Sequence, residues 1–393
     1  MTEQAASRKK KIAFFWLRAI CFALLAALLL TYAIFVLTPK HDYGICSMMN
    51  LYRQPENSVD VLAVGTSLAY AGINTNVLWE EYGIAAYDLC SAEQPFWVSY
   101  YTIREALKTQ RPKVILLDAK PAIYTWDYSK RGRTILSTFG IKGIENRIGA
   151  ILACVEKPRD AMGYILGLPE VHSNYAKLES NDFVFPPDNG GRGASWKGYI
   201  ESDVIEQHQK PSFVWISVRR NMNDREEEYA RKIFALCRDE GITVMLIGLP
   251  NPDYANDHMY YNALWAVAEE YGVSGLNYND PAMRFGLRYS SDFADWQHLN
   301  VKGSVTFSRR LAEDLLESFD LPDHRGEEKY ASYDECAEQW FAKYPTFESS
   351  GWEARPLDWF PEPGFSPEDM EEPFDLPEPF PEVFDGFEEG EIL

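Results

Sequence analysis

The sequence is poor in basic residues. It has 38 Lys and Arg against 59 Asp and Glu, for a formal net charge of −21 over 393 residues. Binding to nucleic-acid phosphates needs a basic surface, so this balance argues against a nucleic-acid partner. Residues 361–393 contain twelve acidic residues and neither Lys nor Arg. More than half of the charge imbalance therefore belongs to the C-terminal tail.

Cysteine pairs with metal-ligand spacing are also missing. No two of the six cysteines form a Cys-x-x-Cys pair, so the sequence gives no support to a structural zinc or iron–sulfur site. The spacing of the six cysteines also does not indicate which of them would pair in a disulfide. We expect neither a metal nor an organic cofactor. The sequence also contains no internal repeat of the length found in solenoid proteins. The six residues are Cys21, Cys46, Cys90, Cys154, Cys237 and Cys336.

One long apolar run lies near the N-terminus. Residues 19–37 contain no charged side chain, and the run extends back to Ile12 with Arg18 as its only charge. As a helix, residues 19–37 would span about 28 Å, close to the hydrocarbon thickness of a bilayer. Basic residues 8–11 precede the run, which predicts a cytoplasmic N-terminus and an extracytoplasmic remainder.

Two other interpretations of this run are open. A cleaved signal peptide usually has an apolar core of about 7–15 residues followed by a small-x-small site. Here the core is longer, and residues 38–41 (Thr-Pro-Lys-His) offer no such site. A buried helix of a soluble protein is the second alternative. Length and flanking charge favour an uncleaved, single-pass anchor in the cell membrane.

Changes in composition divide the rest of the chain. Aromatic residues make up 14% of it, which excludes a disordered chain as the whole structure. We expect a basic cytoplasmic N-terminus (1–11), the anchor (12–37), a connector (38–57), an α/β domain (58–325) with an insertion at about 119–222, a helical extension (326–355), and an acidic, Pro-rich disordered tail (356–393).

Short apolar runs alternate with helical patterns in the predicted domain. Near-continuous apolar strands alternating with helices are typical of a parallel sheet covered on both faces. The sequence therefore predicts a doubly wound α/β fold. We expect strands at 59–64, 84–89, 113–117, 242–249 and 273–276, and helices at 76–82, 95–109, 223–240, 260–271, 302–319 and 332–344.

The turn after the first predicted strand contains the first candidate site residue. Gly65 allows a sharp bend, and Ser67 follows it at the start of the next helix. Ligands of open parallel sheets bind at the carboxyl ends of the strands, and free N–H groups at a helix start can stabilise an oxyanion. Ser67 is a nucleophile if a base reaches it. The alternative is an ordinary N-cap, a position that Ser and Thr favour.

The second candidate site precedes the last helix of the predicted domain. Asp295 and His298 are separated by two residues, so a carboxylate can bind one ring nitrogen and leave the other free to accept a proton. A surface pair of polar residues before a helix is the alternative. In a doubly wound fold, this pair and Ser67 would meet at the same edge of the sheet.

These two blocks together resemble the SGNH/GDSL hydrolase superfamily. There a Gly-Asp-Ser-like turn follows the first strand, and Asp-x-x-His precedes the last helix. Gly65-Thr66-Ser67 is similar to the first block, with Thr in place of Asp, and Asp295 to Asn300 is similar to the last. The resemblance implies a flavodoxin-like (SGNH) fold over roughly residues 58–320. It also implies Ser67 as nucleophile, His298 as general base and Asp295 as its orienting partner.

The middle blocks of the superfamily are less well matched. We expect oxyanion donors from the Ser67 amide and from the backbone near Ser91, which follows the second predicted strand. The Gly-x-Asn-Asp block is absent, and residues 117–120 (Leu-Asp-Ala-Lys) occupy its place. Aromatic residues of the insertion suit stacking on carbohydrate, although packing of a lid explains them as well. The residues that we expect at the substrate are Gln94, Asp118, Trp196, Tyr199 and Asn300.

The anchor narrows the resemblance to one group within the superfamily. A membrane-tethered, outward-facing SGNH domain is similar to proteins of teichoic-acid D-alanylation and of alginate and exopolysaccharide O-acetylation. These act beside an acyltransferase of the MBOAT family. The resemblance implies a serine O-acyltransferase or acyl esterase that acts on an envelope polysaccharide or teichoic acid through an acyl-serine. The alternative is a catalytically silent scaffold that binds the glycopolymer or the membrane acyltransferase.

Overall fold

The computed structural model describes residues 3–40, 43–185, 196–210, 217–252, 257–280, 283 and 285–344. They all belong to the first of two units into which the chain divides, Met1–Trp359. The predicted tail at 356–393 lies outside the described residues, as does the end of the predicted helical extension beyond residue 344.

Five short strands form one parallel sheet with the order β2-β1-β3-β4-β5. This order is that of a doubly wound α/β sheet, with the switch point between β1 and β3. The predicted strands and their parallel arrangement are confirmed, with ends shifted by one or two residues. The strands are β1 (Val61–Val64), β2 (Ala86–Asp88), β3 (Val114–Asp118), β4 (Thr243–Gly248) and β5 (Ser274–Asn277).

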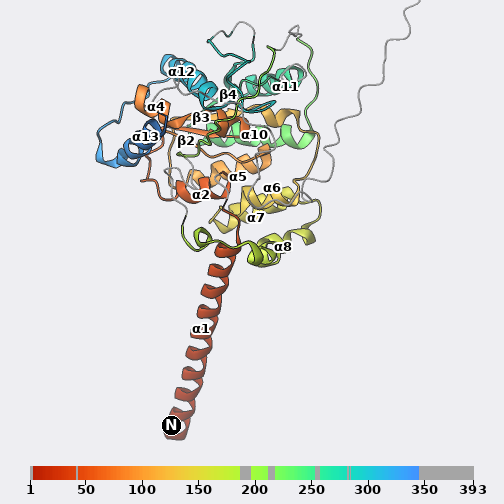
Figure 1. Cartoon of the computed structure of the whole chain (residues 1–393). Helices are drawn as coiled ribbons and strands as arrows, with labels where there is room; N and C mark the ends of the chain where they lie inside the picture. The colour runs from red at the N-terminus through yellow and green to blue at the C-terminus, as the bar shows by residue number, and fades with distance from the viewer. Residues whose placement is uncertain are drawn as a thin grey trace, which may run out of the picture. The chain divides into compact units, whose positions relative to one another are not determined.

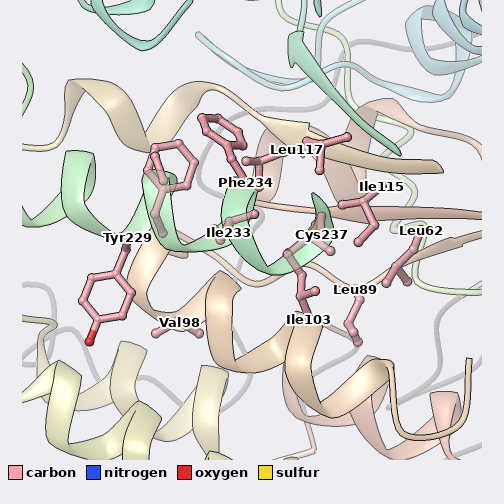
Figure 2. Close-up of a cluster of buried hydrophobic side chains, with 14 of the residues drawn as sticks. Leu62, Leu89, Val98, Ile103, Ile115, Leu117, Tyr229, Ile233, Phe234 and Cys237 are labelled. Atoms are coloured by element: carbon pink, nitrogen blue, oxygen red, sulfur yellow. The ribbon is translucent and has the colours of Figure 1, made fainter. Parts of the chain in front are cut away.

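Helices cover both faces of the sheet, as expected (Figure 1). One face packs against α2 (Ile45–Leu51), α5 (Phe96–Ala106), α10 (Asp224–Asp239) and α11 (His258–Glu269). The other packs against α3 (Ser67–Gly72), α4 (Thr75–Tyr82) and α12 (Val301–Ser318). Figure 2 shows the first of these two cores, in which Ile233 and Phe234 of α10 lie beside Ile115 and Leu117 of β3.

Local sequence explains where several of these helices begin. The side chains of Asn74, Asn223 and Asn300 accept backbone N–H groups at the starts of α4, α10 and α12. Such caps satisfy donors that the first helical turn leaves free. Gly83 ends α4 in the left-handed region, with φ of +70°.

The segment that we expected as a connector, 38–57, contains a helix. Its residues 45–51 form α2, and every residue of this helix is buried. The sequence Ile-Cys-Ser-Met-Met-Asn-Leu has no charge, so its burial against the sheet stabilises it as a core helix. The C-terminal extension contains η6 (Glu328–Tyr330) and α13 (Ala331–Lys343), and α13 packs on α4 with Trp340 fully buried.

The insertion is helical in its first part and lacks helices at 196–210. The second part crosses the carboxyl edge of the sheet, where the N–H of Ile200 donates to the carbonyl of Tyr70 in α3. The elements of the first part are η1 (Lys120–Ile123), α6 (Arg131–Thr138), α7 (Ile144–Cys154), η2 (Pro158–Asp160), α8 (Ala161–Leu166), α9 (Leu168–Val171), η3 (His172–Lys177) and η4 (Ser180–Phe183).

A single long helix, α1 (Glu3–Leu37), precedes the domain (Figure 1). Its segment Lys11–Leu37 is long and apolar enough to cross a membrane. Only 6% of its most apolar window is buried, unlike a core helix of a soluble protein, while a signal sequence would meet the same criteria of length and composition. Such a helix agrees with the expected anchor.

Candidate active site

Ser67 is the first residue of α3, directly beyond the end of β1. The N-cap of this helix is Thr66, whose side chain accepts the N–H of Leu68 at 3.3 Å. Capping is therefore done by the neighbouring residue, and the alternative interpretation of Ser67 as the cap is wrong. The hydroxyl of Ser67 is left for another partner.

That partner is His298. Its Nε2 lies 2.7 Å from Ser67 Oγ, although 231 positions separate the two residues in sequence. Its Nδ1 lies 2.7 Å from Asp295 Oδ2. With the ring proton on Nδ1, Nε2 accepts the serine proton, as in a serine hydrolase triad. The structure thus brings together all three residues that the sequence nominated for catalysis.

Asp295 is held as an anion by several donors. Its Oδ1 accepts the N–H groups of Gln297 and His298, both at 2.8 Å. Burial raises the pKa of this carboxyl, but the hydrogen bond and charge of His298 and the two N–H donors outweigh burial and lower the pKa below its ordinary value. A carboxylate that stays ionised keeps the imidazole in one tautomer and orientation.

Asn300 holds the loop that carries the pair. Its side-chain amide donates to the carbonyls of Val204, Ser291 and Phe293, while its Oδ1 accepts the N–H of Gly303 at the start of α12. One buried side chain thus ties together both ends of the loop, α12 and the insertion. Asn300 is fully buried, so it positions the site rather than contacting substrate.

A second carboxyl supports the serine turn from the neighbouring strand. Asp118, the last residue of β3, accepts the N–H of Thr66 at 3.0 Å and also its hydroxyl, both through Oδ2. Its Oδ1 accepts the N–H of Lys120. Burial raises the pKa of Asp118, and these hydrogen bonds partly oppose the rise. A Cβ on Gly65 would lie 2.2 Å from the Cβ of Asp118, so only glycine allows this approach.

Sequence reasoning missed this supporting pair, because we placed Asp118 at the substrate. A signal was present. β1 and β3 flank the switch point of a doubly wound sheet, so residues directly after β1 and at the end of β3 are neighbours. Asp118 is fully buried and its oxygens are engaged by protein donors.

The expected oxyanion donor at Ser91 requires correction. Its N–H donates to the carbonyl of Gly65 at 3.1 Å, so this amide holds the turn before Ser67. Among the described residues, no acceptor is found for the N–H of Ser67, which is therefore free to donate to an oxyanion. Within the described part of the chain, one of the two backbone donors that we expected, the Ser67 amide, is thus free to serve the site.

The remaining residues that we expected at the substrate are also placed elsewhere. Gln94 is buried, and its Nε2 donates to Ser99 Oγ. Trp196 and Tyr199 are buried beside α13, and the Tyr199 hydroxyl is hydrogen-bonded to Ser304 Oγ. These side chains have no free face for a carbohydrate, because they fill the core where the insertion meets the domain.

An exposed aromatic residue lies within the site loop itself. Trp296, between Asp295 and Gln297, is 48% exposed. Exposed large aromatic residues often mark binding surfaces. We did not single out Trp296 from the sequence, because an aromatic inside Asp-x-x-His has no distinguishing pattern; its exposure identifies it.

No cluster of three or more His, Cys, Asp or Glu with the geometry to hold a metal ion is found in the part of the chain that the structure describes. In comparisons with known proteins, no family model matches the chain. No curated protein matches its sequence either.

Proposed function

We propose that this protein is a membrane-anchored serine acyl-transfer enzyme of the SGNH type. The observation that supports this most strongly is the hydrogen-bonded chain from Ser67 through His298 to Asp295, with both links at 2.7 Å. The parallel sheet agrees with the same class, because Ser67 begins the helix that follows β1 and the Asp-His pair precedes α12.

The reaction follows from these contacts. Ser67 Oγ attacks the carbonyl carbon of an acyl ester while His298 Nε2 takes the hydroxyl proton. The Ser67 N–H donates to the developing oxyanion, and Asp295 stabilises the imidazolium. As the intermediate collapses, the alkoxide leaves with the proton from His298 and an acyl-serine remains. An acceptor hydroxyl then attacks this ester, His298 takes its proton and returns it to Ser67.

The acceptor defines the two forms of the activity. A sugar or polyol hydroxyl gives an O-acyltransferase, and water gives an esterase. We propose an extracytoplasmic polysaccharide or teichoic acid as the substrate. The apolar helix with its basic N-terminal flank supports an outward-facing domain at the membrane, and Trp296 offers an aromatic face beside the triad.

A fluorophosphonate probe provides the experiment that tests the nucleophile, because it phosphonylates activated serines. We expect the full chain in detergent micelles to be labelled and Ser67→Ala to be unlabelled. Ser91→Ala is the matched control, since it removes a buried hydroxyl nearby but keeps the amide that binds Gly65. Labelling that persists in Ser67→Ala would contradict this assignment.

The engaged amide of Ser91 favours a second candidate, a scaffold of the same fold that has lost efficient catalysis. Such a protein would bind the glycopolymer or a polytopic MBOAT-type acyltransferase through the same surfaces. An intact chain that binds glycopolymer but reacts with no fluorophosphonate and hydrolyses no acyl ester would support the scaffold and argue against the enzyme.

A further inference from the structure

Exposed apolar side chains gather in one short part of the insertion. Outside α1, the described residues include twelve exposed large hydrophobic residues, and six of them lie within residues 162–185. We refer to these six as the collar: Met162, Leu166, Tyr175, Phe183, Val184 and Phe185. Their exposed fractions range from 41% to 72%. Soluble surfaces rarely concentrate large apolar groups in this way.

The collar segment packs around the carboxyl end of α1. The elements α9, η3 and η4 all contact α1. The ring of Phe185 stacks on Phe35 with centroids 6.3 Å apart, and Asn174 Nδ2 donates to the carbonyl of Leu37 at 2.9 Å. Figure 1 shows α8 next to this end of α1. The collar is therefore built onto the last turns of the apolar helix.

Helix length gives the depth of these contacts. A bilayer core of about 30 Å takes roughly 20 helical residues at 1.5 Å per residue. The uncharged run 19–37 is also about this long, but its residues from Ala33 onward are covered by protein. We therefore count from Ile12, with Arg18 reaching back to the inner headgroups, and the hydrocarbon span then ends near Thr31. Residues 32–37 then lie at the outer interface, where the collar meets the helix.

The exposure of side chains along α1 places the outer end of the hydrocarbon span near the same residues. The described side chains of the helix are almost all exposed as far as Tyr32, and from Ala33 onward they are partly or fully covered. Beyond the helix, Lys40 Nζ donates to the carbonyls of Phe35 and Thr38. Its positive charge thus lies at the carboxyl end of α1, where a cation is stabilising. The exposed Arg53 lies over the Phe185 ring at 5.3 Å, where phospholipid phosphates would be within reach.

We propose that the collar is a second membrane contact, inserted into the outer interface of the bilayer around the end of α1. The occupant of this surface is phospholipid, because the helix places the surface at headgroup depth. Aromatic and aliphatic side chains at that depth are stabilised by partial burial among headgroups and upper acyl chains. The inference rests on α1 being the proposed transmembrane anchor, and it goes further by assigning part of the insertion to the membrane.

Cysteine labelling can measure depth at several positions in the full chain, because Cys21 is exposed and the other five cysteines are buried. A thiol-reactive fluorophore on the native Cys21 reports the anchor. In a Cys21→Ala background, Leu166→Cys and Phe183→Cys report the collar. Leu316→Cys is the matched control, as Leu316 is 43% exposed on α12, which packs against α3 and α4. Thermal midpoints show that each variant is folded.

Each protein is reconstituted in phosphatidylcholine–phosphatidylglycerol vesicles that contain lipid with a nitroxide at a shallow or a deep position. We expect the Cys21 label to be quenched most by the deep nitroxide. The collar labels should be quenched most by the shallow one, as for groups about 5–10 Å into the interface. The Leu316→Cys label should keep its emission with both.

The outcomes separate the proposals. Deep quenching at Cys21 without quenching at residues 166 and 183 would overturn the collar but keep the anchor, and would leave the surface for a protein partner. Loss of quenching at Cys21 as well would overturn the anchor. Fluorophosphonate labelling of Ser67 is measured on the same samples and decides the catalytic proposal separately.

Discussion

Asp118 Oδ2 accepts the N–H of Thr66 at 3.0 Å, across the gap between the ends of β3 and β1. The residue next to the candidate nucleophile is thus fixed by a buried carboxyl of the adjacent strand. The contact accounts for the glycine at position 65, since any side chain there would collide with Asp118.

We predict that Asp118→Asn slows the reaction of Ser67 with a fluorophosphonate by roughly 10²-fold, the scale expected when loss of a supporting contact shifts a nucleophile by about 1 Å. Thr66→Val should have a similar effect, because it removes the hydroxyl donor and the cap. Thr66→Ser keeps the hydroxyl donor and the cap, so it should retain most of the wild-type rate. Stopped-flow measurement of fluorophosphonate labelling gives the rate. If Asp118→Asn and Thr66→Val lower only the thermal midpoint and leave the labelling rate unchanged, the contact between Asp118 and Thr66 supports the fold but does not position Ser67.

Replacement of Asp295 tests the second link of the triad. We predict that Asp295→Asn lowers ester turnover by about 10⁴-fold, because an amide does not hold the tautomer that leaves Nε2 as the base. Because its pKa is lowered, the Asp295 carboxylate stays ionised to a lower pH than an ordinary aspartate. Its stabilising contribution is therefore present above the unfolded-state pKa and is lost only as the pH falls through the folded-state value. Asp292→Asn, in the same loop, should keep most of the turnover, and equal loss in both variants would indicate loop disruption instead.

Trp296 provides a test of the acceptor side. We predict that Trp296→Ala raises KM for a glycan acceptor about tenfold, equivalent to roughly 1.4 kcal/mol of binding, while the fluorophosphonate labelling rate stays unchanged. Trp296→Tyr should retain most of the affinity because it keeps an aromatic face. Steady-state kinetics with short oligosaccharides measures the effect. A parallel drop in labelling rate would mean that Trp296 supports the triad loop.

The buried Asp88 should make stability depend on pH. It is fully buried at the end of β2, and neither carboxyl oxygen has a hydrogen-bond partner among the described residues. Burial raises its pKa well above the ordinary value. The folded chain then keeps a proton that the unfolded chain loses above about pH 4, so this group lowers the stability by about 1.4 kcal/mol per pH unit as the pH rises between the two pKa values.

We predict that Asp88→Asn removes this contribution, which raises the stability at neutral pH and makes its decline with pH shallower. Chemical unfolding in detergent micelles at about pH 5, 6 and 7 provides the measurement. Asp239→Asn removes one acidic charge from an exposed position and is the matched control for the change in net charge. An unchanged slope in Asp88→Asn would show that Asp88 is ionised in the folded protein.

Much of the fold follows from local pattern. The strands around 61–64, 114–118 and 243–248 are near-continuous apolar runs, and such runs form buried parallel strands where helices cover both faces of a sheet. The connector was less predictable. Residues 45–51 are too few for a periodic signal, and only the surface offered by the sheet makes them a buried helix.

Site residues were also predictable to different degrees, because a motif is visible in the sequence whereas burial is not. Ser67, Asp295 and His298 lie in short motifs that meet once the strand order is known. Asp118 lies in no such motif, and Asn300 lies in the Asp295–Asn300 block, which gives no sign that its side chain is buried. Burial and the partners around them decide that one fixes the serine turn and the other ties the histidine loop.

Composition and spacing along the chain were sufficient to indicate the apolar helix, the alternating strands and helices, and the three residue types of the triad. Tertiary structure alone decided that Thr66 is the cap, that the Ser91 amide is engaged, that Trp196 and Tyr199 are core residues and that Trp296 is exposed. The engaged Ser91 amide and the burial of Trp196 and Tyr199 depend on contacts between segments far apart in the chain. The Thr66 cap is a local contact with Leu68, but Asp118 of β3 fixes the turn that makes it possible.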